Sequence, residues 1–182
     1  MQFNVLKHLD GNPFANTRFM AYVELGSNQL EDLPVGFLRS SPTLEVLSLY
    51  NNRLTNISSD ILMGLTALKI LYLFQNHITE IPPLTFYHTS LTILAMFNNE
   101  ISTIHKDALK TPKRTLDTVY MYYNDVTKIE DNALDWLANN SKVYLSASHL
   151  IELPHYPAHV KVFSVGDYAH FTPCKQENDR SC

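Results

Sequence analysis

The chain has 182 residues, 45% of them hydrophobic and 18% charged, with a formal net charge of -4. This composition is typical of a globular protein and excludes a disordered or collagen-like chain. The slightly negative net charge does not favour binding to nucleic acid or anionic lipid, so we expect neither as a partner. No window approaches the roughly 18 uninterrupted apolar residues of a membrane helix, and the first residues lack the basic and apolar regions of a signal peptide.

From residue 20 onward one frame recurs, with apolar residues and an asparagine spaced as L-x-x-L-x-L-x-x-N-x-L. The asparagine positions follow one another at steps of 24, 24, 23, 25 and 24 residues, within the range of known solenoid repeats. A sixth, degenerate copy has Asn140 at an apolar position and Ser148 at the asparagine position. The five clear copies are Met20-Val23-Leu25-Asn28-Leu30, Leu44-Leu47-Leu49-Asn52-Leu54, Leu68-Leu71-Leu73-Asn76-Ile78, Leu91-Leu94-Met96-Asn99-Ile101 and Leu116-Val119-Met121-Asn124-Val126, and the sixth is Asn140-Val143-Leu145-Ser148-Leu150.

The alternating apolar residues of each copy predict a short strand with every second side chain pointing inward. One copy cannot bury that face alone, so stacked copies should form a parallel sheet over a common core. The chain turns after each strand, and the asparagine amide can pair with the backbone groups that the turn leaves inside. We therefore predict a structural ladder of Asn28, Asn52, Asn76, Asn99 and Asn124.

The second half of each copy supplies apolar residues for the opposite, convex side. Prolines in this half, as in Leu33-Pro34 and Ile81-Pro82-Pro83, favour extended backbone over a full helix. The proline-free stretch from Glu130 to Ala138 is expected to form about two helical turns. The predicted anchors are Phe14, Leu33, Phe37, Leu38, Ile57, Ile61, Leu65, Ile81, Leu84, Phe86, Ile104, Leu109, Ile129, Leu134 and Leu137.

On these repeats the chain resembles the leucine-rich-repeat family, and specifically its typical 24-residue class, over about residues 14–155. The resemblance implies an α/β solenoid shaped as a horseshoe, with a parallel concave sheet and an irregular, 3₁₀ or short-helix convex side. Residues 1–13 read as the tail of an earlier, truncated repeat or an N-terminal edge. Residues 156–182 read as a final degenerate turn and a partial cysteine-containing cap.

The family class is common in extracellular receptors and matrix proteins, and two sequence features bear on the compartment. Asn56 and Asn139 each begin an N-glycosylation tripeptide. The resemblance implies that Cys174 and Cys182 belong to a cap, bridged to each other or to residues outside this chain; the alternative is two reduced thiols on a polar tail. We expect an extracellular or cell-surface protein, with a cytoplasmic one as the alternative; a membrane anchor would have to come from other segments of the parent protein.

Aromatic residues gather at the strand positions that point away from the core. Large apolar groups exposed on a sheet mark interaction sites, and tyrosine is enriched in interface hot spots. We therefore predict a protein ligand on the concave face; the alternatives are that the rings only stiffen the sheet or that another part of the protein covers them. The predicted ligand-binding residues are Tyr50, Tyr72, Phe74, Phe97, Tyr120, Tyr122, Tyr123 and Tyr144.

Catalytic and cofactor motifs are lacking, because no nucleophile elbow, glycine-rich phosphate loop or HExxH sequence occurs. His155, His159, His170 and Cys174 gather near the end without the spacing of a zinc site, and we predict neither metal nor cofactor. The basic cluster Lys106, Lys110, Lys113 and Arg114 reads as a solvated convex face, with an anionic glycan as a weaker alternative. Two hypotheses remain: an extracellular receptor-type recognition module, and an intracellular scaffold or adaptor.

Overall fold

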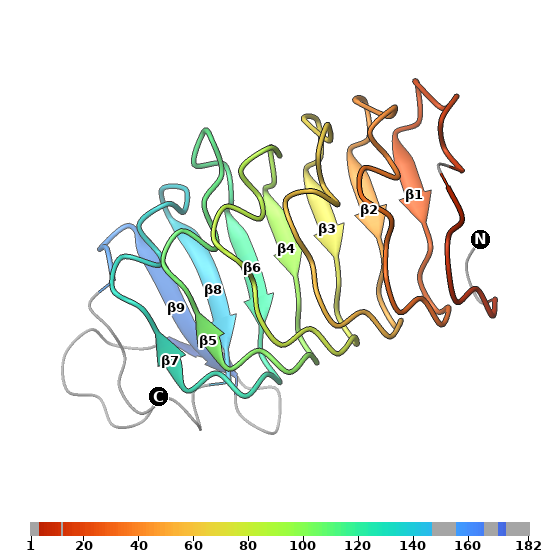
Figure 1. Cartoon of the computed structure of the whole chain (residues 1–182). Coiled ribbons are helices and arrows are strands. Elements are labelled where there is room, and N and C mark those ends of the chain that lie inside the picture. Colours follow the sequence, from red (N-terminus) through yellow and green to blue (C-terminus); the bar gives the residue numbers. More distant parts are fainter. Residues whose placement is uncertain (1–3, 12, 147–155, 166–170, 174–182) are drawn as a thin grey trace.

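The chain winds into a solenoid whose coils each contribute one strand to a common sheet (Figure 1). A computed structural model describes residues 4–11, 13–146, 156–165 and 171–173. The predicted solenoid with a parallel sheet and little helix is confirmed. The sixth copy is described only as far as Ser146, and Ser148, Leu150, Leu153 and Pro154 lie outside the described residues.

The main sheet has the strand order β1-β2-β3-β4-β6-β8-β9-β10, and all its neighbouring strands are parallel except β9 and β10. Figure 1 shows these strands side by side in one row, with β1 and β9 near opposite ends. The strands are β1 (Tyr22–Glu24), β2 (Val46–Ser48), β3 (Ile70–Tyr72), β4 (Ile93–Ala95), β6 (Thr118–Met121), β8 (Ser141–Leu145), β9 (Val160–Val165) and β10 (Phe171–Pro173).

The register of the sheet follows the repeat, because equivalent residues of successive copies lie opposite one another. Leu47 is paired with Leu71, and Leu71 with Leu94. All three are fully buried. Strand β9 continues the same register beyond the last recognised copy, with Val162 opposite Val143.

The convex side is built from turns, and the described residues contain no helix. Two short strands there, β5 (Thr103–Ile104) and β7 (Lys128–Ile129), pair in parallel. The prediction of helical turns between Glu130 and Ala138 is wrong. The amides of Ala133 and Asp135 bond to carbonyls three residues back, and Asn132 has a φ of 64°, which a right-handed helix does not accommodate.

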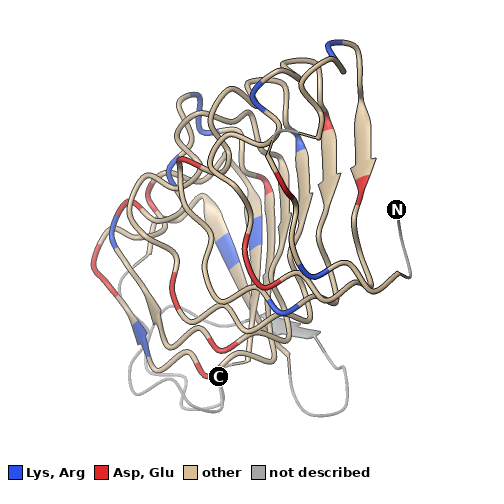
Figure 2. Cartoon of the chain, turned by 45° about the vertical axis from the view of Figure 1, so that its right-hand side comes forward, with Lys and Arg blue, Asp and Glu red and all other residues tan. Residues whose placement is uncertain are grey.

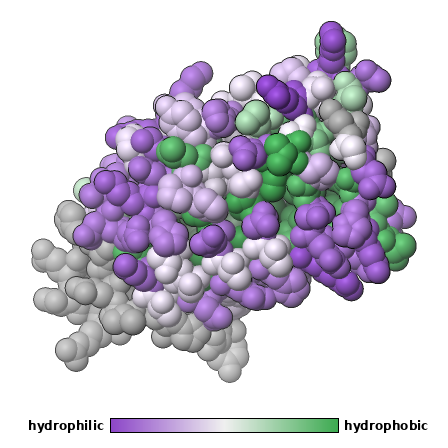
Figure 3. All heavy atoms as spheres, viewed as in Figure 1, coloured by the Kyte–Doolittle hydropathy of each residue, from purple (hydrophilic) through white to green (hydrophobic). Residues whose placement is uncertain are grey.

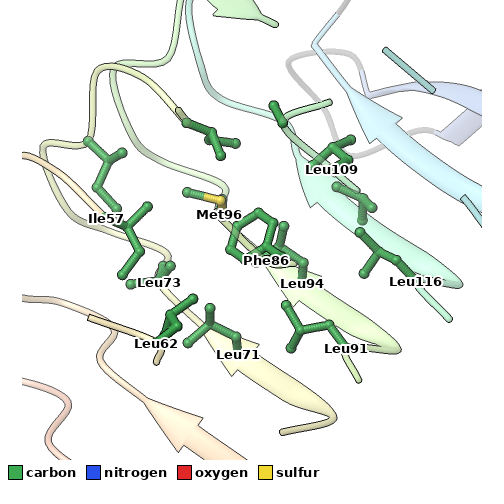
Figure 4. Close-up of a cluster of buried hydrophobic side chains, with 14 of the residues drawn as sticks. Ile57, Leu62, Leu71, Leu73, Phe86, Leu91, Leu94, Met96, Leu109 and Leu116 are labelled. Atoms are coloured by element: carbon green, nitrogen blue, oxygen red, sulfur yellow. The ribbon is translucent and has the colours of Figure 1, made fainter. Parts of the chain in front are cut away.

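The core lies between the sheet and the convex turns, and its side chains come from every coil. Figure 4 shows Leu71, Leu73, Phe86, Leu94 and Met96 in one continuous apolar interior. All five are fully buried. Because each coil contacts its neighbours through this interior, stability is a sum of coil-to-coil interfaces.

The asparagines line up along the inner bend, and the side chain of each joins its own coil to the preceding coil. Asn76 shows the pattern: its Oδ1 accepts from the Leu54 amide at 3.1 Å, and its Nδ2 donates to the Leu49 and Leu73 carbonyls, each at 3.0 Å. Asn52, Asn99 and Asn124 make the equivalent three bonds. Asn28 accepts from the Leu6 amide and donates to the Leu25 carbonyl.

Residues before the first copy continue the same pattern. The Leu6 carbonyl accepts from the Gln29 amide at 2.8 Å, as the Leu30 carbonyl accepts from Arg53 one coil later. Phe14 packs edge-on against Phe37, with ring centroids 6.1 Å apart. This end of the solenoid exposes Val5, Phe19 and Val35, and Figure 3 shows hydrophobic atoms gathered toward the β1 side.

Candidate binding face

The sheet presents one face to the core and the other to solvent, and the solvent side corresponds to the predicted concave surface. We call it the exposed sheet face. Three positions in each coil from β1 to β9 of the main sheet point onto it, so its side chains form three columns that cross the strands. These columns hold all the residues predicted to bind a ligand except Tyr123, which follows Tyr122 at the end of β6 and is 42% exposed.

The column at the carboxyl ends of the strands consists of stacked rings, which we call the aromatic ladder: Tyr50, Phe74, Phe97 and Tyr122. Successive ring centroids are 4.8, 4.5 and 4.7 Å apart, with interplanar angles of 12°, 6° and 8°. Each ring is half-buried. Burial, together with neighbouring Tyr120 and Tyr123, raises the pKa of the Tyr122 hydroxyl above its ordinary value.

The middle column carries a second stack toward the other end of the sheet. Tyr120 and Tyr144 stack with centroids 5.0 Å apart, and Tyr144 stacks on Phe163 at the same distance. Tyr72 and Tyr120 meet the aromatic ladder edge-on, at 6.1 Å from Phe74 and 6.4 Å from Tyr122 respectively. The predicted aromatic residues, Tyr123 included, are therefore brought together as one ring network.

Two parts of this face were missed by the sequence analysis. Phe163 extends the second stack, and its place opposite Tyr144 in the register was readable from Val162 repeating the role of Val143. The third column, which we call the aliphatic column, consists of Val46, Ile70 and Ile93, all half-buried. The strand alternation that places Leu47 inside also places Val46 outside, so the sequence already indicated the aliphatic column.

The two ends of the exposed sheet face carry opposite charges. At β1 the Glu24 carboxylate accepts from the Tyr22 hydroxyl at 2.6 Å and from the Gly26 amide at 2.7 Å. This bond to Glu24 is the main reason that the pKa of Tyr22 rises to about 12. At the other end the exposed Lys142 and Lys161 lie opposite each other on β8 and β9. Figure 2 shows the red band on β1 and the two blue bands on neighbouring strands at the far end.

Gly26 holds the ladder position in the first coil, and its missing side chain matters there. A Cβ at Gly26 would lie 2.4 Å from the Tyr50 ring and 2.6 Å from the Glu24 carboxylate. Such distances are far shorter than van der Waals contact. The Tyr50 ring therefore rests on the backbone of Gly26, and the ladder ends against the coil of β1.

The basic cluster on the convex side is partly occupied by internal contacts. The Lys110 ammonium lies 3.7 Å from the centroid of the Trp136 ring and 3.8 Å from the Asp107 carboxylate. Arg114 lies 5.2 Å from the same indole. These cation–π contacts tie neighbouring turns together, whereas Lys106 and Lys113 are exposed.

Two histidines on the described coils contact carboxylates of adjacent coils. His77 Nδ1 lies 2.7 Å from Glu100, and His105 Nδ1 lies 3.3 Å from Glu130. A hydrogen bond from the Lys106 amide, followed by the His105 contact, lowers the pKa of Glu130. Within the described ranges no group of three or more His, Cys, Asp or Glu side chains could hold a metal ion.

The remaining predicted sites are surface asparagines and residues outside the described ranges. Asn56 and Asn139 are both exposed. Cys174 and Cys182, like His155 and His170, lie outside the described residues, whereas His159 is described and half-buried. In the described part of the chain no helix has the length and hydropathy needed to cross a bilayer.

Comparisons with known proteins agree with this architecture. A family model described as "Leucine rich repeat" matches residues 20–78, and no curated protein matches the chain significantly. A TLR13–ssRNA13 complex has a similar fold, with a TM-score of 0.70 and 20% identity, covering 91% of this chain and 22% of that one. An internalin from Listeria monocytogenes has a TM-score of 0.57 and 21% identity, covering 83% of this chain and 42% of that one.

A leucine-rich-repeat protein from Leptospira interrogans has a TM-score of 0.53 and 23% identity, covering 71% of this chain and 32% of that one. The chain thus spans less than half the length of each of these proteins. The recurring frame, the asparagine ladder and the parallel solenoid together show a leucine-rich-repeat fold, and residues 20–78 also match the family model.

Proposed function

We propose that the chain is a recognition module that binds a protein partner on its exposed sheet face, through the aromatic ladder and the aliphatic column. The main observation in support is that four stacked rings and three aliphatic side chains form an uncharged surface, and each of these side chains is half-buried and so still partly exposed to solvent. Apolar surface of this kind favours a partner that removes it from water. Leucine-rich-repeat folds are repeat modules suited to protein interaction, and we propose no catalytic activity.

Stiffening of the sheet explains the ring stacking but not the whole face. Stacked aromatic pairs add to sheet stability whether or not a partner binds. The aliphatic column lies outside these stacks, and Ile70 and Ile93 leave apolar surface toward solvent beside the rings. Both columns together favour binding over a purely structural role.

A protein fits this face better than a nucleic acid does. The TLR13 structure is a complex with RNA, but that likeness concerns the fold. In this chain Asp and Glu outnumber Lys and Arg by 18 to 14, and the centre of the exposed sheet face is uncharged. Phosphate backbones are bound mainly through Lys and Arg.

Site-directed photocrosslinking tests the proposal. A photoreactive phenylalanine analogue at Tyr72, on the exposed sheet face, should crosslink a discrete partner in the cells that make the protein. The same analogue at the exposed convex residue Tyr87 is the matched control. The partner should be lost when Phe74 and Tyr122 are changed to serine. Equal crosslinking from both positions, or an unchanged partner in the serine variant, would argue against this face as the site.

We further propose an extracellular or cell-surface location in a receptor-type or signalling protein. The exposed Asn56, in its glycosylation tripeptide, supports this proposal. Expression behind a secretion signal should give a mass shift that an Asn56→Gln variant loses, and bonded rather than free Cys174 and Cys182. Free thiols together with an unglycosylated, insoluble product would instead favour the intracellular scaffold.

A further inference from the structure

Lys142 and Lys161 stand out because like charges directly opposite each other on adjacent strands are destabilising. Their strands are about 4.8 Å apart, and both side chains are exposed. Within the described part of the chain neither ammonium has a carboxylate at ion-pair distance. We call these two residues the lysine pair. A carboxylate placed between them would relieve the repulsion and accept hydrogen bonds from both ammonium groups.

The surroundings of the lysine pair join it to the binding face. Tyr144 and Phe163 stack beside it, each from the same strand as one of the lysines. The uncharged centre of the exposed sheet face follows, and the fixed Glu24 carboxylate lies at the opposite end. A partner that covers the whole face therefore meets positive charge at one end and negative charge at the other.

The dimensions of the face suit one helix laid across the strands. The three columns span four residue steps along a strand, or about 13 Å, which is close to the roughly 10–12 Å diameter of an α-helix. Six strand spacings separate β1 from β9 in the sheet order, which gives about 29 Å. At about 1.5 Å per residue this length corresponds to roughly 19 helical residues.

We propose that the partner contributes an amphipathic helix, with its apolar side on the aromatic ladder and aliphatic column and its acidic end over the lysine pair. This inference rests on the proposed function and adds the polarity of the bound segment. Acidic side chains at the Glu24 end are disfavoured by the same reasoning. The net charge of -4 favours the opposite preference, a basic partner, so the local and global electrostatics make different predictions.

Two synthetic helical peptides of about 19 residues provide the probe. Both carry leucine and phenylalanine along one side, and one ends in four glutamates where the other ends in four lysines. Binding to the purified chain is measured by fluorescence anisotropy at low and high salt. We expect the glutamate-ended peptide to bind about tenfold tighter or more at low salt, with a smaller difference at high salt.

Charge reversal of the lysine pair is the decisive variant. The Lys142→Glu/Lys161→Glu protein should prefer the lysine-ended peptide, whereas Lys106→Glu/Lys113→Glu, with the same change in net charge on the convex side, should keep the original preference. Circular dichroism establishes that each variant is folded. The proposal is overturned if the wild-type chain binds neither peptide at millimolar concentration, shows no preference, or keeps its preference after reversal of the lysine pair.

A variant with Tyr72, Phe74 and Tyr122 changed to serine separates this proposal from the proposed function. Loss of both peptides in this variant, with no charge preference in the wild type, would refute only the polarity. Unchanged binding of both peptides to the serine variant would refute the exposed sheet face itself.

Discussion

Replacing Asn76 with leucine tests the asparagine ladder most directly. Asn76 is 5% exposed. Its side chain accepts a hydrogen bond from the Leu54 backbone amide and donates to the backbone carbonyls of Leu49 and Leu73. Leucine has nearly the same size but can neither accept nor donate. The substitution therefore leaves the buried Leu54 amide without its partner, whereas the Leu49 and Leu73 carbonyls each keep a bond from Asn52 and Asn99 respectively.

Each buried backbone group left unpaired costs about 1–3 kcal/mol. The Leu54 amide is left unpaired, and the Leu49 and Leu73 carbonyls each lose one of two bonds, at about 0.5–1.5 kcal/mol per bond. We therefore expect the free energy of unfolding to fall by about 2–4 kcal/mol. This is a large fraction of the stability of an ordinary domain.

Urea unfolding followed by circular dichroism measures this change. Thr79→Ala is the matched control, because Thr79 is an exposed residue of the same coil, and its substitution should alter stability by less than about 0.5 kcal/mol. A loss below about 1 kcal/mol for Asn76→Leu would show that water or backbone rearrangement replaces the amide, and the structural role assigned to the ladder would be refuted.

Three further predictions concern the core and two titrating groups. Phe86→Ala should lower the free energy of unfolding by about 3–5 kcal/mol, because the fully buried ring leaves a cavity; urea unfolding measures the loss. The Tyr22 hydroxyl should ionise near pH 12, so the stability from its bond to Glu24 is present at neutral pH and is lost as pH rises through that value. NMR of labelled tyrosine measures this ionisation. The lowered pKa of Glu130 means that the fold favours its ionised carboxylate. This carboxylate should therefore stabilise the fold above the ordinary pKa of a glutamate, and the stabilisation should be lost as pH falls through the lowered pKa. Urea unfolding midpoints measured between pH 2 and pH 7 test this dependence.

Each of these predictions has a control. Tyr87→Ala removes an exposed convex ring and should cost much less than Phe86→Ala; equal losses would contradict the assigned packing. In Glu24→Gln the Tyr22 pKa should return toward 10, and a value unchanged near 12 would exclude the carboxylate as the cause. Glu130→Gln should flatten the acid dependence, whereas a parallel curve would assign that dependence to other groups.

The repeat frame predicted the fold because it uses the same residues for the same purpose in every coil. Leu47, Leu71 and Leu94 recur at one strand position, and the structure places all three inside and in register. The Glu130–Ala138 segment repeats the convex turn of earlier coils, because Asn132 has a positive φ, as Leu84 and Asp107 have at the equivalent positions. Local helix propensity does not capture this backbone.

The exposed sheet face was readable from the sequence as a set of positions but not as a geometry. Alternation places Tyr50, Phe74 and Phe97 on one side of the sheet, whereas whether the rings splay apart or stack depends on side-chain rotamers set by neighbours. The bond between Tyr22 and Glu24 likewise depends on rotamers. The pairing of Lys142 with Lys161 follows from the same β8–β9 register that places Phe163 opposite Tyr144, so it was readable only by extending the repeat beyond its last recognised copy.

The close stacking of the aromatic ladder determines which part of each ring a partner can touch. In Phe74 and Phe97 both π faces are covered by neighbouring rings, so only the rims point outward. An aromatic ring is electron-rich on its faces and electron-poor at its rim. The uncharged centre of the sheet is therefore weakly electropositive toward solvent, and it favours carbonyl oxygens, carboxylates and the faces of other rings over ammonium groups.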